Sequence, residues 1–455
     1  LCSPERLWWT RGDGDMRLPE LNLFKHQLEG IARIKESKRC LLAWEPGCAK
    51  TRTTLEALRA LACERVLVVA PAALLSVWHD EMMKWYGTTP TLVRGTKAKR
   101  ESLWQATGIK VVSYETLRAD FPIVRGLSWD AIVLDESYKI QNPRSKITKT
   151  ILSLSAPVRV ALNGVPLSNS WADLWAVCTW LDPGCLYGSF WKFRSIHAIM
   201  NPYYPAIVGW RDVEGIKRRT EHLISWKRKE DVLKDLPPIS EQVISFDLSK
   251  KEREVYDLIR DELRVELQGE DVPVGNSLVK LLRLKQTTNG LFAFGENKVS
   301  SKLDLCLELL SSLPAGASAL VFSSFKETIN ELHKRLPDAL KITGDTGAVE
   351  REETVKLFQS GAVLTLIGTD SVAFGLNLQA ASYVLNLDLP YSYAKYQQRI
   401  SRAHRQGQTR PVTVWNLQAN KSVDFHVAKI LSRKMVMADD AAGITREDID
   451  EILNT

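Results

Sequence analysis

The sequence predicts an α/β protein in which two parallel-sheet lobes follow one another along the chain, with a mostly helical segment between them. Short apolar runs alternate with amphipathic stretches, and this rhythm occurs twice. Apolar strands separated by helices indicate a parallel sheet that is covered on both faces. The chain has 455 residues, 45% of them hydrophobic and 25% charged, so its length allows two or three domains with sizeable cores.

Ten apolar runs are expected to form the strands of the two sheets. Those of the first lobe are Cys40–Trp44, Val66–Ala70, Ile109–Ser113, Ala131–Asp135 and Val158–Leu162, with helices expected at Leu74–Trp85 and Ser145–Leu154. Those of the second lobe are Ala319–Ser323, Leu340–Thr343, Val363–Gly368, Tyr383–Leu387 and Val412–Leu417. Ligands of such folds bind at the carboxyl ends of the strands, so we expect functional residues directly after these runs.

The segment between the lobes, roughly Ser189–Asn289, has a helical, basic and aromatic pattern. Its basic clusters are WKFR at Trp191–Arg194, KRRT at Lys217–Thr220 and WKRK at Trp226–Lys229. Basic residues with interleaved tryptophans suit a phosphate backbone, but a solvated helical face with inward tryptophans gives the same pattern. Leu236-Pro237-Pro238 breaks the chain. We therefore expect a first lobe with a helical extension at 1–238 and a second lobe with a helical segment at 239–455.

A phosphate-binding loop is predicted in AWEPGCAKTRTTLEAL, after the first apolar run. Strand, glycine loop, Lys-Thr and helix is the order that presents backbone N–H groups and a helix N-terminus to an anion. Lys50 would neutralise the outer phosphates, and the Thr51 hydroxyl would bind magnesium. Ala49 stands where glycine is usual, which is tolerable in a first helical turn but not at positive φ. The predicted nucleotide contacts of this loop are Gly47, Cys48, Ala49, Lys50, Thr51 and Arg52.

Two further segments complete the predicted site. LDESYKI places the adjacent carboxylates of Asp135 and Glu136 at the end of a buried strand, where they could hold a metal ion and orient a water. QRISRAHRQGQ is a basic, glutamine-rich segment of helical composition, and its arginines could stabilise charge on a phosphoryl group. Its arginines are Arg399, Arg402 and Arg405. Together with the phosphate loop, these segments predict a nucleoside triphosphatase whose site is completed from two lobes.

Composition and charge fit a folded protein of the cytoplasm. The net charge of +7 permits a nucleic-acid partner without requiring one. Seven scattered cysteines, with no Cys-x-x-Cys pair or zinc-type spacing, indicate reduced thiols. We see no signal peptide, and the longest apolar run, around Val66–Leu75, contains Pro71 and is too short to span a bilayer. We expect no contact with a membrane.

Nine segments in order, from about Leu18 to Leu417, closely resemble the motifs of the superfamily 2 helicases of the Swi/Snf type, in their compact bacterial and phage form. These segments are LNLFKHQLEG, VLVVAPAALLSVWHDEMMKW, VVSYETLR, DESYKIQNPRSK, ALNGVPLSNSWADLW, WKRKEDVLKDLPP, LVFSSFKET, GTDSVAFGLNLQAASYVLNLD and QRISRAHRQGQ. The resemblance implies two RecA-like lobes with ATP between them, and WKRKEDVLKDLPP resembles a basic helix that leads out of the first lobe.

The resemblance also implies roles for individual residues. Adenine would lie near Phe24 and Gln27, with Gly375 also at the nucleotide. Thr51 and Asp135 would hold Mg²⁺. Glu136 would orient the attacking water, while Arg402 and Arg405 would act on the γ-phosphoryl group. The implied DNA contacts are Pro71, Ser113, Ser323, Ser324 and Thr369, with charge from Lys227 and Arg228.

Four departures from the family pattern keep alternatives open. Tyr138 replaces a histidine, Val165 replaces a threonine, Trp226 and Lys227 stand where an arginine pair is usual, and Ala49 replaces a glycine. The leading interpretation is a DNA-stimulated ATPase motor on double-stranded DNA, acting as a monomer in the cytoplasm of a bacterial or phage-infected cell. The alternatives are a nucleic-acid-binding module that has lost efficient turnover, and a helicase that separates strands of DNA or RNA.

Overall fold

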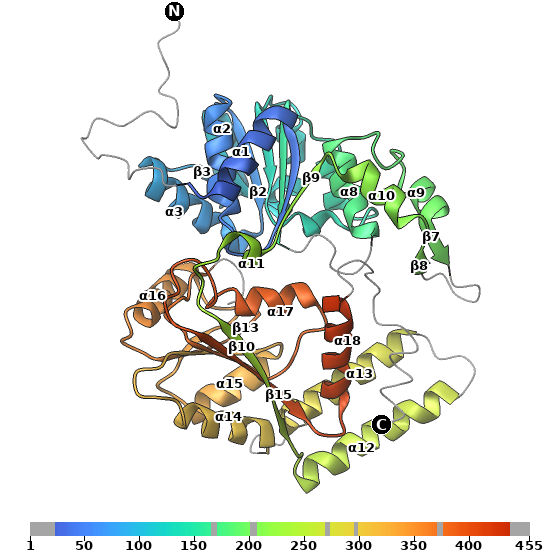
Figure 1. The fold of residues 1–455 in the computed structure, drawn as a ribbon, viewed down its shortest axis with the longest axis vertical. Coiled ribbons are helices and arrows are strands. Elements are labelled where there is room, and N and C mark those ends of the chain that lie inside the picture. The colour runs from blue at the N-terminus through green and yellow to red at the C-terminus, as the bar shows by residue number, and fades with distance from the viewer. Residues whose placement is uncertain are drawn as a thin grey trace, which may run out of the picture. The chain divides into compact units, whose positions relative to one another are not determined.

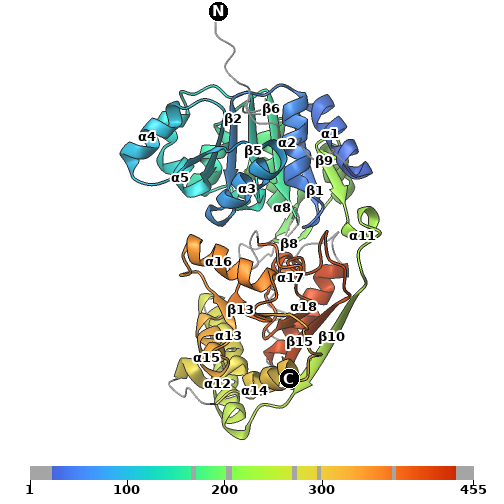
Figure 2. The same cartoon turned by 90° about the vertical axis from the view of Figure 1, so that its left-hand side faces the viewer.

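The fold is available as a computed structural model, which describes residues 23–164, 171–200, 207–268, 274–294, 299–370 and 376–436 (Figure 1). The chain divides into two compact units, residues 1–234 and 235–455. Each unit is built around a parallel sheet of its own. Each sheet has helices on both faces, as Figure 2 also shows. The prediction of two parallel-sheet lobes is therefore confirmed.

The sheet of the first unit has seven strands in the order β3-β4-β2-β5-β6-β1-β9, and every neighbouring pair is parallel. The strand that leads to the phosphate loop, β1, lies between β6 and β9, and β5 lies on the other side of β6. The strand bounds are β1 Arg39–Trp44, β2 Val66–Ala70, β3 Thr91–Val93, β4 Ile109–Ser113, β5 Ala131–Leu134, β6 Val158–Asn163 and β9 Ile224–Lys227.

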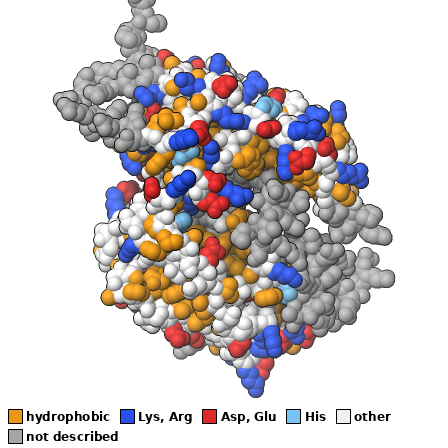
Figure 3. Space-filling view, viewed as in Figure 1, with side chains coloured by type: hydrophobic (Ala, Val, Ile, Leu, Met, Phe, Trp, Pro, Cys, Tyr) orange, Lys and Arg blue, Asp and Glu red, His pale blue; other side chains and the backbone are white. Residues whose placement is uncertain are grey.

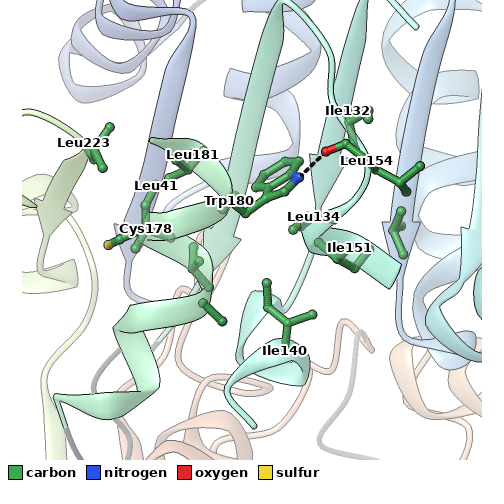
Figure 4. Close-up of a cluster of buried hydrophobic side chains, with 14 of the residues drawn as sticks. Leu41, Ile132, Leu134, Ile140, Ile151, Leu154, Cys178, Trp180, Leu181 and Leu223 are labelled. Carbon is green, nitrogen blue, oxygen red and sulfur yellow. Dashed lines mark hydrogen bonds between the residues drawn. The ribbon is translucent and has the colours of Figure 1, made fainter. Parts of the chain in front are cut away.

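Helices cover both faces of this sheet because its central strands are apolar on both sides. In β1, Leu42 belongs to a core with α1, α2 and α3, whereas its neighbour Leu41 belongs to a core with α5, α7 and α8. Figure 4 shows the second core, in which the indole N–H of Trp180 donates to the carbonyl of Leu154 at 3.1 Å. The helices are α1 Lys25–Ser37, α2 Lys50–Ala60, η1 Ala72–Leu74, α3 Leu75–Tyr86, α4 Lys97–Gln105, α5 Tyr114–Ala119, α6 Phe121–Val124, η2 Ser137–Ile140, α7 Lys146–Leu152, α8 Ala172–Leu181, α9 Phe190–His197, α10 Val213–Thr220 and α11 Lys229–Val232.

The second unit repeats the architecture with six parallel strands in the order β10-β15-β14-β11-β13-β12. One face packs against α14 and α15, and the other against α12, α13, α16, α17 and α18. The strands are β10 Ile239–Phe246, β11 Ala319–Ser323, β12 Leu340–Ile342, β13 Thr365–Thr369, β14 Tyr383–Asn386 and β15 Val412–Ala419. The helices are α12 Lys250–Gln268, α13 Val274–Asn289, η3 Leu291–Phe294, α14 Ser301–Ser311, α15 Lys326–Arg335, α16 Ala348–Gln359, α17 Tyr393–Ile400 and α18 Val423–Val436.

The segment between the lobes differs from the expectation of a mostly helical insertion. It contains an antiparallel hairpin, β7 Ala198–Met200 with β8 Ile207–Trp210, and it also gives one edge strand to each sheet. The WKRK cluster, expected in a helix, enters β9, where Lys227 pairs with Trp44 of β1. An edge strand is paired on one side and half solvated on the other, so it needs no continuous apolar run. For this reason, apolar runs in the sequence do not predict β9 and β10.

No helix in the described ranges combines the length and the apolar character that crossing a lipid bilayer requires.

Candidate active site

The phosphate loop runs from the end of β1 into α2, and its backbone is bent through left-handed conformations. Gly47 has φ 96°, and Ala49, which precedes the first residue of α2, has φ 57° and ψ 37°. Ala49 therefore does not lie in the first helical turn, the alternative in which alanine would be tolerable. A left-handed conformation costs a residue with a Cβ atom about 1–2 kcal/mol. The sequence thus places a strained residue directly beside Lys50.

Lys50 is held inside its own loop by backbone oxygens. Its Nζ donates to the carbonyl of Trp44 at 2.8 Å and to that of Glu45 at 3.3 Å. These acceptors are neutral, and no described carboxylate lies within ion-pair distance of the ammonium group. An uncompensated cation at a helix N-terminus is a suitable place for an anion. Thr51 follows in the first turn of α2, where its side chain is half-buried.

Two other loop residues have surroundings that limit their chemistry. Cys48 is fully buried, and burial raises the pKa of its thiol to about 11, so the thiol is inert at neutral pH. Arg52 is directed away from the loop: its guanidinium carbon lies 3.7 Å from the ring centre of Trp85 on α3. This contact gives Arg52 a packing role between α2 and α3, and its contact with nucleotide remains a prediction.

The N-terminus of α1 offers an unused donor beside the phosphate loop. Gln27 is buried, and its Oε1 accepts from the backbone N–H of Phe24 at 3.0 Å, whereas its Nε2 has no hydrogen-bond partner among the residues that the structure describes. A buried donor without an acceptor costs about 1–3 kcal/mol, so an acceptor from a bound base would satisfy it. Phe24 stacks on His26, and the His26 Nε2 lies 3.2 Å from the Cys48 carbonyl. His26, which the sequence analysis missed, thus joins this end of α1 to the loop.

The carboxylate of Asp135 is buried and oriented by two donors. Its Oδ2 accepts from the indole N–H of Trp78 on α3, and its Oδ1 accepts from the backbone N–H of Glu136, both at 2.9 Å. Burial raises the pKa of Asp135, while the Trp78 hydrogen bond and the charge of Lys50 act in the opposite direction. The influence of Lys50 places its ammonium within electrostatic range of this carboxylate. Glu136 has φ 48°, so the second predicted carboxylate also stands on strained backbone.

Strand order brings the predicted residues of the first unit to one edge of its sheet. β1, β6 and β5 are consecutive neighbours. β1 ends at the phosphate loop, β6 ends at Asn163, and β5 ends directly before Asp135. Gly164 follows β6 so closely that an added Cβ atom would lie 3.0 Å from the Pro46 ring. Gly164 therefore packs directly on the phosphate loop. Val165 lies outside the described residues.

The donor set fits a magnesium ion that is held mainly by phosphate and water. Among the described residues there is no group of three or more His, Cys, Asp or Glu side chains that could form a protein cage for a metal. Mg²⁺ commonly keeps several waters and binds through one or two carboxylates together with substrate phosphates. A single buried carboxylate, Asp135, with the Thr51 hydroxyl nearby in the loop, is consistent with that mode of binding.

In the second unit, Arg399 is the centre of a buried polar network. Its guanidinium donates to Asp370 at 2.8 Å, to the Asp388 carbonyl at 2.6 Å and to the Ser324 hydroxyl at 3.1 Å. Burial would raise the pKa of the Asp388 carboxyl, but the charges of Lys285 and Arg399 hold it below its usual value. Arg399 is fully buried. Its position makes it a structural residue of this unit.

Arg402 and Arg405 lie beyond the end of α17, in irregular turns, and not in a helix as the composition suggested. The Arg402 guanidinium donates to the carbonyl of Gln398 at 3.1 Å and to that of Leu376 at 3.1 Å, and that of Arg405 donates to Asn377. The segment therefore docks on the Gly-Leu-Asn-Leu motif. Arg402 is buried, whereas Arg405 is partly exposed. Gly375, the first residue of that motif, lies outside the described residues.

The predicted DNA contacts fall into pairs on neighbouring strands. In the first unit, Ser113 pairs in register with Ala70, so it lies beside Pro71 at the same sheet edge. In the second unit, Ser323 pairs in register with Thr369. Ser323 is fully buried and its hydroxyl donates to Asp388 at 2.5 Å, so its placement suits positioning of its neighbours better than direct contact.

The remaining candidates of both units already have protein partners. Lys227 forms an ion pair with Glu29 at 2.5 Å, and the exposed Arg228 lies 3.6 Å from Glu230. In the second unit, Ser324 accepts from Arg399 through its hydroxyl, and its backbone N–H donates to Asp388 at 3.0 Å. Contact of these residues with DNA remains a prediction.

Tyr138, which replaces the usual histidine, lies in η2, two residues after the predicted catalytic carboxylate of Glu136. It is largely buried, and burial raises the pKa of its hydroxyl, so the group stays neutral at every ordinary pH. A neutral hydroxyl can still donate and accept a hydrogen bond. The replacement therefore keeps hydrogen-bonding capacity at this position but removes a group that could carry positive charge.

Comparison with known proteins agrees with the order of the motifs. The chain matches the family model described as "SNF2-related domain" over residues 26–292, and the model described as "Helicase conserved C-terminal domain" over residues 301–407. Among solved structures it is similar to "Sulfolobus solfataricus SWI2/SNF2 ATPase core in complex with dsDNA", with 24% identity, a TM-score of 0.45, and coverage of 93% of this chain and 96% of that one.

Two curated relatives illustrate the range of similar proteins. "CHD3-type chromatin-remodeling factor PICKLE" of Arabidopsis thaliana is 24% identical over 498 residues, which are 95% of this chain and 35% of that protein. "Uncharacterized ATP-dependent helicase YqhH" of Bacillus subtilis is 24% identical over 469 residues, which are 96% of this chain and 82% of that protein. The chain spans between 21% and 38% of the length of four plant remodelling proteins that it matches.

Proposed function

Because this chain belongs to the SNF2-related domain family, the Swi/Snf-type ATP hydrolases of helicase superfamily 2, we propose that it is a DNA-stimulated motor that moves along double-stranded DNA. The observation that carries the proposal is the sheet edge of the first unit. There Lys50, which has no ion-pair partner among the described residues, follows β1, and the buried Asp135 carboxylate and the strained Glu136 follow β5 on the other side of β6. This arrangement suits a bound nucleoside triphosphate better than it suits a purely structural turn.

The residues of the first unit would divide the chemistry between them. Lys50 would leave the carbonyls of Trp44 and Glu45 for the outer phosphates, since an anion is a stronger acceptor than a neutral carbonyl. Glu136 would orient the attacking water and take its proton. The Nε2 of Gln27 would donate to the adenine base.

Asp135 and Thr51 would hold the metal ion of the nucleotide. When bound, Mg²⁺ would neutralise charge on the phosphoryl oxygens during transfer. Trp78 would favour the ionised form of Asp135 and orient it for this task, because its N–H donates to the carboxylate and acts against the rise in pKa that burial causes.

The second unit would supply the arginines that complete the site. Arg402 and Arg405 would stabilise charge on the γ-phosphoryl group, a contribution of about 10³–10⁵ in rate where such arginines are known. Hydrolysis would remove this bridge between the units. Alternate grip of the two units on one strand would then move the chain along the duplex. The monomeric state and the cytoplasmic, bacterial or phage setting also remain predictions.

The deciding experiment is an ATPase assay with duplex DNA, single-stranded DNA and RNA side by side. We expect duplex DNA to stimulate turnover most strongly, and Lys50→Ala and Glu136→Gln to abolish it. Glu136→Gln should still bind ATP, because the carboxylate acts on water and not on the nucleotide. ATP turnover at the parent rate in either variant would contradict the assignment of Lys50 and Glu136 to the active site.

Two further outcomes of this assay would favour the alternatives. DNA binding without measurable turnover in the parent would favour a module that has lost catalysis. Separation of a forked duplex, without displacement of a triplex strand, would favour a strand-separating helicase.

A further inference from the structure

An exposed tryptophan on α9 contacts two arginine side chains from different parts of the first unit. Trp191 has 52% of its surface exposed. The guanidinium carbon of Arg144, in the loop between η2 and α7, lies 4.8 Å from its ring centre, and that of Arg194 lies 5.4 Å away. Guanidinium groups stack on indole rings with a modest stabilisation, about 0.5–1 kcal/mol at exposed sites. The ring thus holds both cations at one place on the surface.

A second aromatic ring, that of Tyr187 just before α9, contacts two more cations. The ring centre of Tyr187 lies 4.6 Å from the guanidinium carbon of Arg219 on α10 and 5.8 Å from the Nζ of Lys192 on α9. Figure 3 shows Lys and Arg side chains, together with Asp and Glu side chains, over the part of the first unit that carries α9 and α10. We call Arg144, Lys192, Arg194 and Arg219, with their two rings, the α9 patch.

The cations of the α9 patch lack acidic partners. None of its four basic side chains is within ion-pair distance of a carboxylate in the described parts of the chain. Lys217 on the same α10 helix, in contrast, is paired with Glu214 at 3.0 Å. A solvated helical face usually mixes both signs of charge and keeps tryptophan inward. Four such cations around one exposed and one partly buried ring instead complement a polyanion.

Arg144 also connects this patch to the catalytic carboxylates along the chain. It lies eight residues after Glu136, separated from it by η2. The end of η2 is fixed to α7, because the Thr148 hydroxyl donates to the Ile140 carbonyl at 2.9 Å. A ligand bound to Arg144 would therefore contact the end of a short, anchored segment. That segment begins at Glu136, the residue predicted to orient the water.

We propose that the α9 patch binds the phosphodiester backbone of DNA, as a contact additional to the sheet-edge residues named above. The proposal rests on the proposed function, since it supposes that DNA is the track. Arg144 and Arg194 bind phosphates, and Trp191 holds them ready to do so. Phosphate contacts fix position without reading sequence, so the patch serves any duplex equally.

The test is a salt titration of binding to a fluorescent duplex by anisotropy, with the 455-residue chain. The double variant Arg144→Gln/Arg194→Gln leaves two phosphates without their arginines. The slope of log affinity against log salt should therefore become shallower by about 0.9 for each of these two phosphates. The control Lys97→Gln/Lys356→Gln removes the same charge from two exposed lysines that already have carboxylate partners, Glu101 and Glu352. Its slope should equal that of the parent.

The tryptophan is tested separately, because its removal leaves the charge count unchanged. Trp191→Ala should weaken binding at fixed salt while keeping the parent's slope, and Trp191→Phe, which retains a ring, should recover most of the affinity. Phe425→Ala removes another exposed aromatic side chain, on α18, and should bind as the parent does. Thermal melting of each variant checks that the fold is intact.

The outcomes separate this proposal from the proposed function. A double variant that titrates like its control, in a parent that binds and is stimulated by DNA, overturns the α9 patch alone. A parent that binds neither duplex nor single-stranded DNA overturns both proposals. Binding of RNA without any affinity for DNA also overturns the patch as proposed. The double variant could have a shallower salt slope with single-stranded DNA and an unchanged slope with duplex DNA. That result would show that the patch binds a displaced strand, and it would overturn the proposal that the patch binds a duplex.

Discussion

At the scale of single residues, the candidate site combines a strained backbone with a buried carboxylate. Ala49 and Glu136 have positive φ, and Asp135 keeps a carboxylate in a buried position that raises its pKa. Strain and buried charge of this kind persist only where the surrounding structure imposes them, and they concentrate at functional sites. A loop that only connected β1 to α2 would not need these destabilising features, so we interpret them as signs of a functional site.

Replacing Trp78 by phenylalanine should shift the acid limb of the ATPase pH profile to higher pH. Burial already raises the pKa of Asp135, and the Trp78 hydrogen bond counteracts that rise. Without the bond, the pKa rises further, and the ionised form needed for metal binding is lost at a higher pH as the solution is acidified. Turnover at alkaline pH should suffer less. The measurement is kcat against pH at saturating Mg²⁺ and ATP.

Trp104→Phe is the matched control for this change. Trp104 is also fully buried in the first unit, and its N–H donates to the Asp120 carboxylate at 2.9 Å. It should lose a similar amount of stability and keep the parent's pH profile. Identical pH profiles for Trp78→Phe and Trp104→Phe would mean that Trp78 supports the core and does not tune Asp135.

Replacing Ala49 by glycine should stabilise the first unit without loss of turnover. Glycine adopts positive φ freely, so the left-handed penalty disappears, partly offset by glycine's greater entropy in the unfolded chain. The expected net gain is at most about 1 kcal/mol. The measurements are the melting temperature and kcat. Ala62→Gly, at φ 53° in an exposed turn, is the control for the gain in stability. A destabilised Ala49→Gly would contradict the backbone conformation of the loop.

At the scale of elements, apolar runs predicted the central strands of both sheets and the edge strand β12, but not the edge strands β3, β9 and β10. Val66–Ala70, Ile109–Ser113 and Ala319–Ser323 form strands with the predicted bounds, because central strands of a parallel sheet are continuous apolar runs. β10 is exposed along most of its length and has no such run, yet it pairs with β15 over eight residues. Its place depends on a partner far away in the sequence, so no local pattern indicates it.

The candidate site divides in the same way between local and long-range information. Lys50, Asp135 and Glu136 follow strands within recognisable motifs, and the sequence therefore indicated them. Trp78, by contrast, reaches Asp135 from a helix 57 positions earlier, and nothing in its neighbours signals a hydrogen bond to a carboxylate. Arg399 shared a segment with two predicted catalytic arginines, and only the buried network shows that it is a structural residue.

Replacing Gly30 by alanine should weaken ATP binding through the helix that carries Gln27. An added Cβ atom would lie 2.5 Å from the Trp44 ring and 2.9 Å from the Thr53 side chain, so α1 must move away from β1. Overpacking of this kind usually costs about 1–3 kcal/mol. We expect a lower melting temperature and a higher KM for ATP. Gly126→Ala, whose Cβ would meet nothing closer than 3.6 Å, is the control. Equal KM values for the two variants would contradict a role for α1 in nucleotide binding.

At the scale of the whole molecule, the predicted catalytic residues are divided between two units that each have a complete core. Lys50, Asp135 and Glu136 belong to the first unit, and Arg402 and Arg405 to the second. A nucleotide that binds residues from both units would couple them, and loss of its terminal phosphate would weaken that coupling. Such a division makes turnover sensitive to changes in the second unit that leave the first unit untouched.

Arg405 is the cleanest place to test this division. Arg402 is buried and hydrogen-bonded to the Leu376 carbonyl, so its loss would also disturb the second unit, whereas Arg405 is partly exposed. Arg405→Ala should bind ATP nearly as the parent does but hydrolyse it about 10³–10⁵ times more slowly, since the arginine would act on charge that develops only in the transition state. Nucleotide affinity and single-turnover hydrolysis are the measurements. Arg410→Ala, which removes an exposed arginine just after the segment that contains Arg405, should retain the parent rate. Hydrolysis by Arg405→Ala at the rate of Arg410→Ala would show that the first unit completes its own site, and that the two-unit mechanism is wrong.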